Sequence, residues 1–351
     1  MKDITEIIIL LKDLIKTPSF SRAENKSADL IQQFLKLKAY SINRKGNNLW
    51  VYGKNNKIDL PFILLNSHHD TVKPVESWTI DPFEPVEEKG KIFGLGSNDA
   101  GASLVSLLAT FFYLDEIQKN YNIVFAATAE EEISGAEGMH SIIDDLEKIN
   151  LAVIGEPTIM QMAVAEKGLL VLDCTAEGKA GHAARDEGDN AIYKAQKDIE
   201  WIRKYNFPKK SELLGQVKMT VTQINAGIQH NIIPDNCNFV VDVRSNEKYS
   251  NKEIFEIIDK NTLSKVTPRS FRLNSSSIDL NHPIVKKGVE MGLTYFGSPT
   301  TSDQATIPWK SIKIGPGDSA RSHSANEYIY ISEIEKAISI YIELLKDLEL
   351  S

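Results

Sequence analysis

Cysteine is scarce in this 351-residue sequence, which limits the kinds of site that the chain can build. The two cysteines, Cys174 and Cys237, lie far apart in apolar, strand-like segments. This placement fits two reduced core thiols better than a disulfide framework or a zinc knuckle. We therefore expect a cytoplasmic protein, in which any metal site would use nitrogen and oxygen ligands instead of thiolates.

Long apolar runs and an excess of basic residues are also missing. The N-terminal apolar run extends only from Ile7 to Leu11, and the apolar residues around it follow a helical period, which predicts an amphipathic helix and neither a signal peptide nor a membrane span. The chain has 48 acidic against 40 basic residues, a formal charge of −8, and no dense Lys or Arg cluster. We therefore expect neither a membrane nor a nucleic acid as a partner.

Helix-like and strand-like segments alternate along the first 164 residues. Helices are predicted at 3–16, 24–38, 101–114 and 138–148, and strands at 49–52, 62–65, 123–127 and 151–154. Short apolar strands separated by helices are typical of an α/β sheet with helices on its faces.

From about residue 165 the strands change to an alternating, half-buried pattern. The predicted strands are 169–175, 217–224 and 238–244, and the helices between them are 189–204 and 251–259. This pattern indicates a smaller α+β layer that is covered on one side only. Helix and strand alternate again from 283 and end in a helix over 331–348. We therefore predict one α/β domain, 1–164 with 269–351, interrupted by an inserted domain at 165–268.

Acidic residues and histidines gather just after the buried strands. They are His68, His69, Asp70, Asp99, Glu130, Glu131, Glu132 and Glu156. Taken singly, a histidine after a strand can be a hydrogen-bonded cap, and three glutamates are common at a solvated helix start. In open α/β sheets, however, ligands bind beyond the carboxyl ends of the strands, so these side chains should converge. Several carboxylates at one edge would repel each other unless a cation were bound, which makes a metal site the simplest explanation.

The residue types indicate which metal and which roles. Histidine with carboxylates suits zinc, cobalt or manganese in a catalytic site that keeps a position open for water. In the His-x-Asp pattern, His68 can bind metal while the Asp70 carboxylate holds its other ring N–H. His69 should point elsewhere, because side chains alternate in an extended segment. Glu131 and Glu132 cannot both bind one metal equivalently, so we expect one base and one ligand.

An ordered set of motifs between residues 66 and 327 resembles the M20 zinc peptidases and deacylases. The motifs are Ser67–Val72, Gly94–Gly101, Thr128–Glu132, Ile154–Thr158, Gly178–Ala183, Asn231–Pro234, Asp242–Arg244, and Gly315–Gly317 followed by His323. Two departures are visible: the lysine that many relatives have shortly after the bridging aspartate is missing from Asp99-Ala100-Gly101, and Glu130 replaces an aspartate. Neither departure touches a proposed ligand.

The resemblance implies a mixed-sheet zinc-hydrolase catalytic domain with two zinc ions, for which cobalt or manganese could substitute. Asp99 would bridge the ions. The remaining ligands would be His68 and Glu156 for one ion, and Glu132 and His323 for the other. Glu131 matches the family's general base, which takes a proton from the attacking water. The inserted domain matches a lid and dimerisation domain, so a homodimer is expected.

The resemblance also implies how substrate is held. His182 matches a histidine that reaches the partner subunit's active site and stabilises the oxyanion. The positions expected to hold the substrate's carboxylate are Arg244, Asn231 and Thr301. Gly315 begins a Gly-Pro-Gly segment that is either a turn or a backbone contact to substrate. Arg185 would suit a succinyl carboxylate, but a surface salt bridge is at least as good an explanation.

We expect the substrate to be a small N-acyl amino acid, with N-acetylornithine in arginine biosynthesis as the first choice. N-succinylornithine, an N-acylcitrulline, or a small peptide cleaved by a dipeptidase or exopeptidase are alternatives. A catalytically degenerate, metal-dependent binding protein is a different class of answer. That class is disfavoured because every proposed ligand and the base are present in the sequence.

Overall fold

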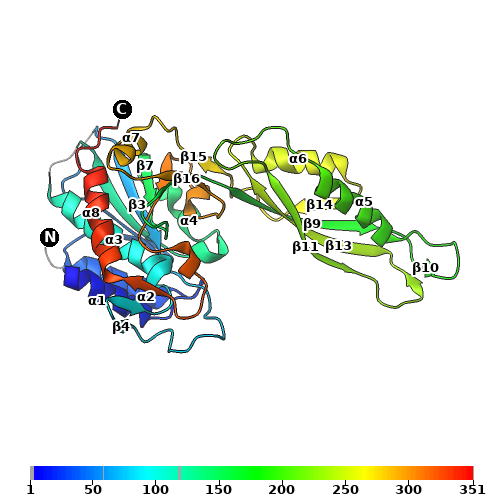
Figure 1. Cartoon of the computed structure of the whole chain (residues 1–351), viewed down its shortest axis with the longest axis horizontal. Helices are drawn as coiled ribbons and strands as arrows, with labels where there is room; N and C mark the ends of the chain where they lie inside the picture. Colours follow the sequence, from blue (N-terminus) through cyan, green and yellow to red (C-terminus); the bar gives the residue numbers. More distant parts are fainter. Residues whose placement is uncertain (1–3, 58, 118–119, 351) are drawn as a thin grey trace. The chain divides into compact units, whose positions relative to one another are not determined.

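The structure, a computed structural model, describes residues 4–57, 59–117 and 120–350. It divides into two compact units (Figure 1). The first unit contains Met1–Val164, Ile278–Phe296 and Ser302–Ser351, and the second contains Ala165–Ser277 and Gly297–Thr301. The second unit begins at the residue where we expected the insertion to begin. It runs past Pro268, the last residue of the expected insertion, to Ser277.

A mixed sheet forms the centre of the first unit, in the order β1-β2-β6-β3-β7-β17-β8, with β16 also pairing with β8. Its strands are β1 (Ile42–Lys45), β2 (Asn48–Tyr52), β3 (Phe62–His68), β6 (Asn122–Thr128), β7 (Ile149–Ile154), β8 (Met162–Glu166), β16 (Tyr295–Ser298) and β17 (Ser311–Lys313). Strand β3 runs parallel to β6 and β7, and β17 runs parallel to β7. The outer pairings, β1 with β2, β2 with β6 and β17 with β8, are antiparallel. The predicted α/β class with a mixed sheet is confirmed.

Helices pack against this sheet, as its continuously buried central strands require. They are α1 (Ile4–Ile15), α2 (Asn25–Leu37), α3 (Ala102–Glu116), α4 (Met139–Ile142), α7 (Pro283–Glu290) and α8 (Ile331–Leu345). A small sheet, in the order β18-β5-β4, consists of β4 (Val86–Glu88), β5 (Lys91–Phe93) and β18 (Tyr328–Tyr330). Most side chains of α3 are buried, and this helix contacts both β3 and α8.

The helix predicted over 138–148 is shorter than expected. Helix α4 ends at Ile142 and is followed by a single 3₁₀ turn, Ile143–Asp145, before β7. The Lys45 ammonium donates to the Ser141 carbonyl at 2.8 Å and pairs with the Asp145 carboxylate at 2.7 Å. The backbone of Leu146 is extended, with φ −88° and ψ 149°, and this ends the helical conformation before β7.

The second unit is built on a four-stranded antiparallel sheet in the order β11-β13-β9-β14. Its elements are β9 (Gly168–Glu177), β10 (Gly181–His182), α5 (Ala191–Lys204), β11 (Lys218–Ala226), β12 (Ile232–Ile233), β13 (Asn236–Ser245), α6 (Asn251–Asn261), β14 (Lys265–Pro268) and β15 (Ser276–Ser277). Buried and half-buried residues alternate along β9 and β13, and the buried set packs with apolar residues of α5 and α6. This one-sided α+β layer is the architecture that the alternating strands predicted.

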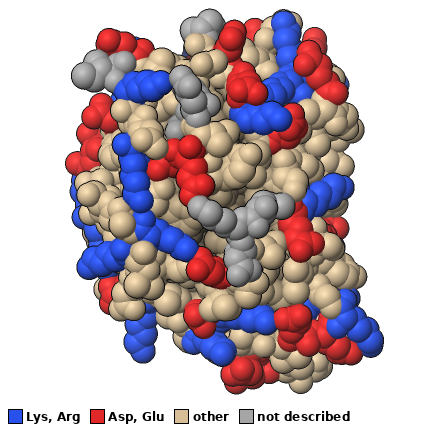
Figure 2. Space-filling model, turned by 90° about the vertical axis from the view of Figure 1, so that its left-hand side faces the viewer, with Lys and Arg blue, Asp and Glu red and all other residues tan. Residues whose placement is uncertain are grey.

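Within the described residues, no helix has the length and apolar character needed to cross a bilayer. Figure 2 shows basic and acidic side chains interspersed over one face of the molecule, so neither sign of charge dominates that face.

Candidate metal centre and active site

The site lies where three neighbouring parallel strands of the first unit end. His68 is the last residue of β3 and is paired in register with Thr128, the last residue of β6. On the other side of β3, Asn66 is paired with Ile154, the last residue of β7. Glu131 follows β6 by three residues, and Glu156 follows β7 by two. The common edge therefore places side chains from three chain segments within reach of one another.

Histidine nitrogens and carboxylate oxygens approach closely at this edge. His68 Nε2 lies 3.3 Å from Asp99 Oδ1, 3.7 Å from Glu156 Oε1 and 3.9 Å from Glu131 Oε2. His323 Nε2 lies 2.9 Å from Glu132 Oε2 and 3.7 Å from Asp99 Oδ2. Two trios, His68 with Glu131 and Glu156, and His68 with Asp99 and Glu132, have ligand atoms within 4.8 Å of one another.

Asp99 faces the two histidines with different oxygen atoms. Its Oδ1 is directed to His68 and its Oδ2 to His323, which is the arrangement that a carboxylate bridging two cations requires. The donor set contains only imidazole and carboxylate groups, which fits two divalent ions of the zinc, cobalt or manganese type. In this arrangement His68 and Glu156 would complete one ion, and Glu132 and His323 the other.

Asp70 contacts His68 and also binds the backbone of the two glutamates. His68 Nδ1 lies 3.0 Å from the Asp70 carbonyl oxygen, whereas the nearest carboxylate oxygen of Asp70 is 3.5 Å away. The carboxylate also accepts the backbone N–H groups of Glu131 and Glu132 at 3.0 and 3.2 Å, and the Ser21 hydroxyl at 2.7 Å. Asp70 therefore contacts His68 through both its main chain and its carboxylate, and its side chain also positions the two glutamates.

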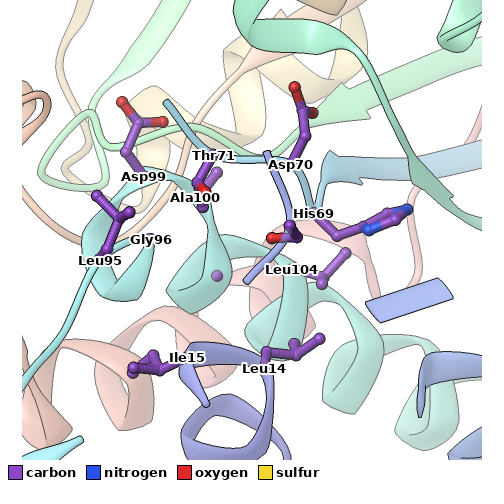
Figure 3. A pocket seen from close by; sticks show the side chains of 12 residues that line it. Leu14, Ile15, His69, Asp70, Thr71, Leu95, Gly96, Asp99, Ala100 and Leu104 are labelled. Carbon is purple, nitrogen blue, oxygen red and sulfur yellow. The ribbon is translucent and has the colours of Figure 1, made fainter. Parts of the chain in front are cut away.

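His69 points away from the cluster, as the alternation along β3 predicts. Its Nδ1 lies 2.9 Å from Ser27 Oγ, and its Nε2 lies 2.9 Å from the carbonyl oxygen of Asn47. Figure 3 shows the His69 ring directed to one side, while the carboxylates of Asp70 and Asp99 extend in a common direction away from Leu14 and Leu104. The buried His69 therefore has a structural role.

The electrostatics of the cluster fit a cation. Burial raises the pKa of Glu156 to about 8, and burial together with the charge of Glu156 raises the pKa of Glu131 well above its usual range. The hydrogen bond that His323 donates to the Glu132 carboxylate raises the pKa of His323 to about 9. Burial alone would lower the pKa of His68, but its contacts with Asp70 and Asp99 outweigh burial and raise it. These buried carboxylates carry more negative charge than the two histidines can neutralise, and a divalent cation would relieve the excess.

These shifts predict that the metal-free protein loses stability as the pH rises. Glu156 and His323 have folded-state pKa values of about 8 and about 9, both above their usual values, so these two groups bind more protons in the folded state than in the unfolded state up to about pH 9. The free energy of unfolding of metal-free protein should therefore fall between pH 5 and pH 9. Urea unfolding at pH 6 and pH 9, with chelator and with zinc, measures this.

Bound zinc should remove that loss of stability, because metal ligands bind in their deprotonated forms. Metal-free Glu156→Gln should lose the part of the pH dependence that lies below about pH 8. Equal urea midpoints at pH 6 and pH 9 for the metal-free wild-type protein would contradict the interpretation.

The other residues assigned to substrate binding lie mainly in the second unit. Arg244 makes a two-point contact with Asp242 at 2.9 and 3.0 Å and donates to Thr301 Oγ1 at 3.3 Å. Asn231 has a buried Oδ1 without a hydrogen-bond partner among the described residues. His182 is exposed on β10, and Arg185 lies 3.9 Å from Glu187 in an exposed ion pair. The geometry of the second unit does not test the roles of His182, Arg185, Asn231, Arg244 and Thr301, which stay predictions.

Gly315 belongs to the first unit and lies against a proposed ligand. Its N–H donates to Thr158 Oγ1 at 3.0 Å, and its carbonyl accepts from the N–H groups of Thr158 and Met160. A Cβ at this position would come within 2.4 Å of the Glu156 carbonyl oxygen. Glycine is therefore required for close packing behind Glu156, and the predicted backbone contact with substrate stays a prediction.

Glu327, to which the sequence motifs assign no role, contacts the segment that carries Asp99. Its carboxylate accepts the backbone N–H groups of Gly96, Asn98 and Asp99 at 3.1, 2.8 and 2.9 Å. These partners lie 228 to 231 residues earlier in the chain, so no local pattern could identify them. The only available signal was the position of Glu327 four residues after His323.

Comparison with known proteins decides the family. The sequence profile of Peptidase family M20/M25/M40 matches residues 64–347, which is most of the chain. The protein belongs to this family. It is therefore a metal-dependent hydrolase of the M20 type, and the cluster at the ends of β3, β6 and β7 is the candidate for its metal centre.

Curated relatives of this M20 protein include hydrolases that act on amino-acid derivatives. A [LysW]-lysine/[LysW]-ornithine hydrolase of Sulfurisphaera tokodaii is 27% identical over 97% of this chain and 94% of its own length. An acetylornithine deacetylase of Proteus mirabilis is 26% identical, with 97% and 96% covered. A succinyl-diaminopimelate desuccinylase of Nitratiruptor is 24% identical, with 97% and 99% covered.

Solved structures of the family share the fold. The aminopeptidase PepT of Bacillus cereus superposes with a TM-score of 0.76 at 19% identity, covering 97% of both chains. A dinuclear metal-binding peptidase of the M20 family from Bacillus subtilis gives a TM-score of 0.74 at 17% identity, also covering 97% of both chains. At these identities the likeness supports the fold of this M20 protein and does not select a substrate.

Proposed function

We propose that this M20 hydrolase is a two-zinc amidohydrolase that removes the acyl group from an Nα-acyl amino acid, with N-acetylornithine as the preferred substrate. The observation that carries the proposal is Asp99 placed between His68 and His323, with the carboxylate of Glu131 in the same cluster. The acetylornithine deacetylase of Proteus mirabilis, which aligns over nearly the whole chain, supports the choice of substrate. A role in arginine biosynthesis follows from that substrate.

The residues of the chain divide the chemistry among them. Two zinc ions, when bound, would polarise the amide carbonyl and lower the pKa of the attacking water. Glu131 takes the proton of that water as it attacks the carbonyl carbon, and later returns it to the leaving amine. His182 is proposed to stabilise the oxyanion, and Arg244, Asn231 and Thr301 to bind the substrate's carboxylate.

A substrate panel tests this choice. N-acetylornithine, N-acetylcitrulline, N-succinylornithine, N-succinyl-diaminopimelate and a dipeptide should be compared by kcat/KM with the zinc-loaded enzyme. We expect N-acetylornithine to exceed each of the others by at least about tenfold, because a pocket built for one acyl and one amino-acid group discriminates in this range. A higher value for a succinyl substrate would replace the proposal with a desuccinylase. Arg185→Ala then shows whether Arg185 selects between acetyl and succinyl groups.

We also propose a homodimer formed through the inserted domain, in a cytoplasmic protein. Strand β11 is an edge strand of the four-stranded sheet, and the side chain of Ile224 on it is 59% exposed. An exposed edge with an apolar residue is a surface that proteins usually cover. The cytoplasmic location is supported by Cys174 and Cys237, which are buried and free.

A further inference from the structure

Glu327 is a buried carboxylate that contacts the segment carrying Asp99. It precedes β18 and follows His323 by four residues, and its side chain is buried, with the residue only 2% exposed. Oε1 accepts from the N–H groups of Asn98 and Asp99, and Oε2 accepts from that of Gly96. The carbonyl of Glu327 also accepts the N–H of Gly94 at 3.0 Å. One residue therefore satisfies four backbone donors of the segment that carries Asp99.

The side chain of Asn98 also joins the segment of Asp99 to the segment of His323. Its side-chain amide donates to the Asp318 carbonyl at 3.1 Å and to Ser322 Oγ at 3.2 Å, and its Oδ1 accepts the Asp318 N–H at 3.1 Å. Ser322 is the residue directly before His323. Glu327 and Asn98 together fix the segment of Asp99 against the segment of His323, in which Asp99 Oδ2 lies 3.7 Å from His323 Nε2.

We propose that Glu327 is a positioning residue for the ion that Asp99, Glu132 and His323 hold. The inference rests on the two-metal site of the proposed function. Backbone N–H groups that lose a buried acceptor move toward other partners or water, because an unsatisfied buried donor is costly. Without the Glu327 carboxylate, Asp99 and His323 lose their fixed separation. His68 and Glu156 do not contact Glu327 through any hydrogen bond found in the structure, so the ion on their side is affected less.

Glu327→Gln is the variant that tests this role. Glutamine keeps the length of the side chain, but one carboxylate oxygen becomes an NH₂ group that faces a backbone N–H instead of accepting from it. We expect zinc affinity at the Asp99–Glu132–His323 position to fall by about 10- to 100-fold, as for the loss of other partners that orient metal ligands. Titration calorimetry of zinc into metal-free protein, which needs no substrate, should show two binding steps for wild type, and mainly one of the two steps should be weakened in the variant.

Glu333→Gln is the matched control. The Glu333 carboxylate also makes several hydrogen bonds, to Arg321 at 2.7 and 3.1 Å and to the Tyr330 N–H at 3.0 Å, and it has none to the segment of Asp99. This control should bind both zinc ions as wild type does, even if its unfolding midpoint falls. Wild-type affinity for both ions in Glu327→Gln would overturn the proposal.

A second variant covers the case in which Glu327→Gln does not fold. Glu327→Asp keeps the charge but is shorter by one methylene, so it reaches fewer of the three N–H groups and should weaken the same ion by a smaller factor. Unchanged zinc binding in a folded Glu327→Asp protein would then overturn the proposal. Other results would contradict the proposed function instead of the role of Glu327. In that case the wild-type protein would bind only one zinc ion, or it would bind two ions and cleave none of the acyl amino acids.

Discussion

Replacing Glu131 with glutamine is expected to lower kcat by about 10³-fold while both zinc ions remain bound. General acid–base catalysis by a positioned side chain contributes factors of this size, and glutamine cannot take the proton of the attacking water. The change is isosteric, and the Glu131 backbone N–H that Asp70 accepts is unaffected. Kinetics on N-acetylornithine, together with the zinc content measured by atomic emission, test both parts of this expectation.

Glu130→Gln is a suitable control for that experiment. Glu130 is the preceding residue in the sequence, but it has left-handed backbone dihedrals and its carboxylate lies 3.9 Å from Arg22, outside the two groups of potential ligand atoms. Its kcat should therefore stay near that of wild type. If Glu131→Gln retained more than about a tenth of wild-type kcat, another group would have to be the base.

The sequence could predict the place of the site because the site depends on strand ends. The apolar strands that end near His68, Thr128 and Ile154 are buried and parallel, and parallel neighbours bring their carboxyl ends to one edge. The same reasoning gives the one-sided layer of the second unit, where residues alternate between buried and half-buried along β9 and β13. In both cases the pattern of apolar residues within a single segment is enough to predict the arrangement.

The sequence could not predict contacts that depend on main-chain geometry between distant segments. Asp70 was expected to hold His68 with its carboxylate, but the sequence does not show that this carboxylate also accepts N–H groups at Glu131 and Glu132, or that the carbonyl of Asp70 contacts the histidine. Glu327 likewise binds only backbone donors more than 200 residues away. A backbone N–H is present at every non-proline residue, so the sequence does not show which ones a buried carboxylate will accept.

Replacing Asp99 with asparagine is expected to have an equally large effect, but on metal binding first. The two oxygens of Asp99 face His68 at 3.3 Å and His323 at 3.7 Å, and no other residue of the cluster lies within 4.0 Å of both histidines. An amide offers one weak oxygen ligand and an NH₂ group that no cation binds, so the two halves of the site lose their shared ligand. Zinc stoichiometry should fall from two ions to at most one per chain.

The loss of zinc affinity in Asp99→Asn should exceed about 100-fold, the upper end for losing a partner that only orients a ligand. The activity of Asp99→Asn should fall together with its zinc affinity and should not return at high zinc concentration. The activity of Glu327→Gln should recover as the zinc concentration is raised. Asp318→Asn is the control, because the Asp318 side chain caps a short 3₁₀ turn at Ala320 and has no contact with the ligands. Unfolding of the metal-free proteins separates metal loss from misfolding. Two ions bound at wild-type affinity in a folded Asp99→Asn protein would show that Asp99 is not the bridge.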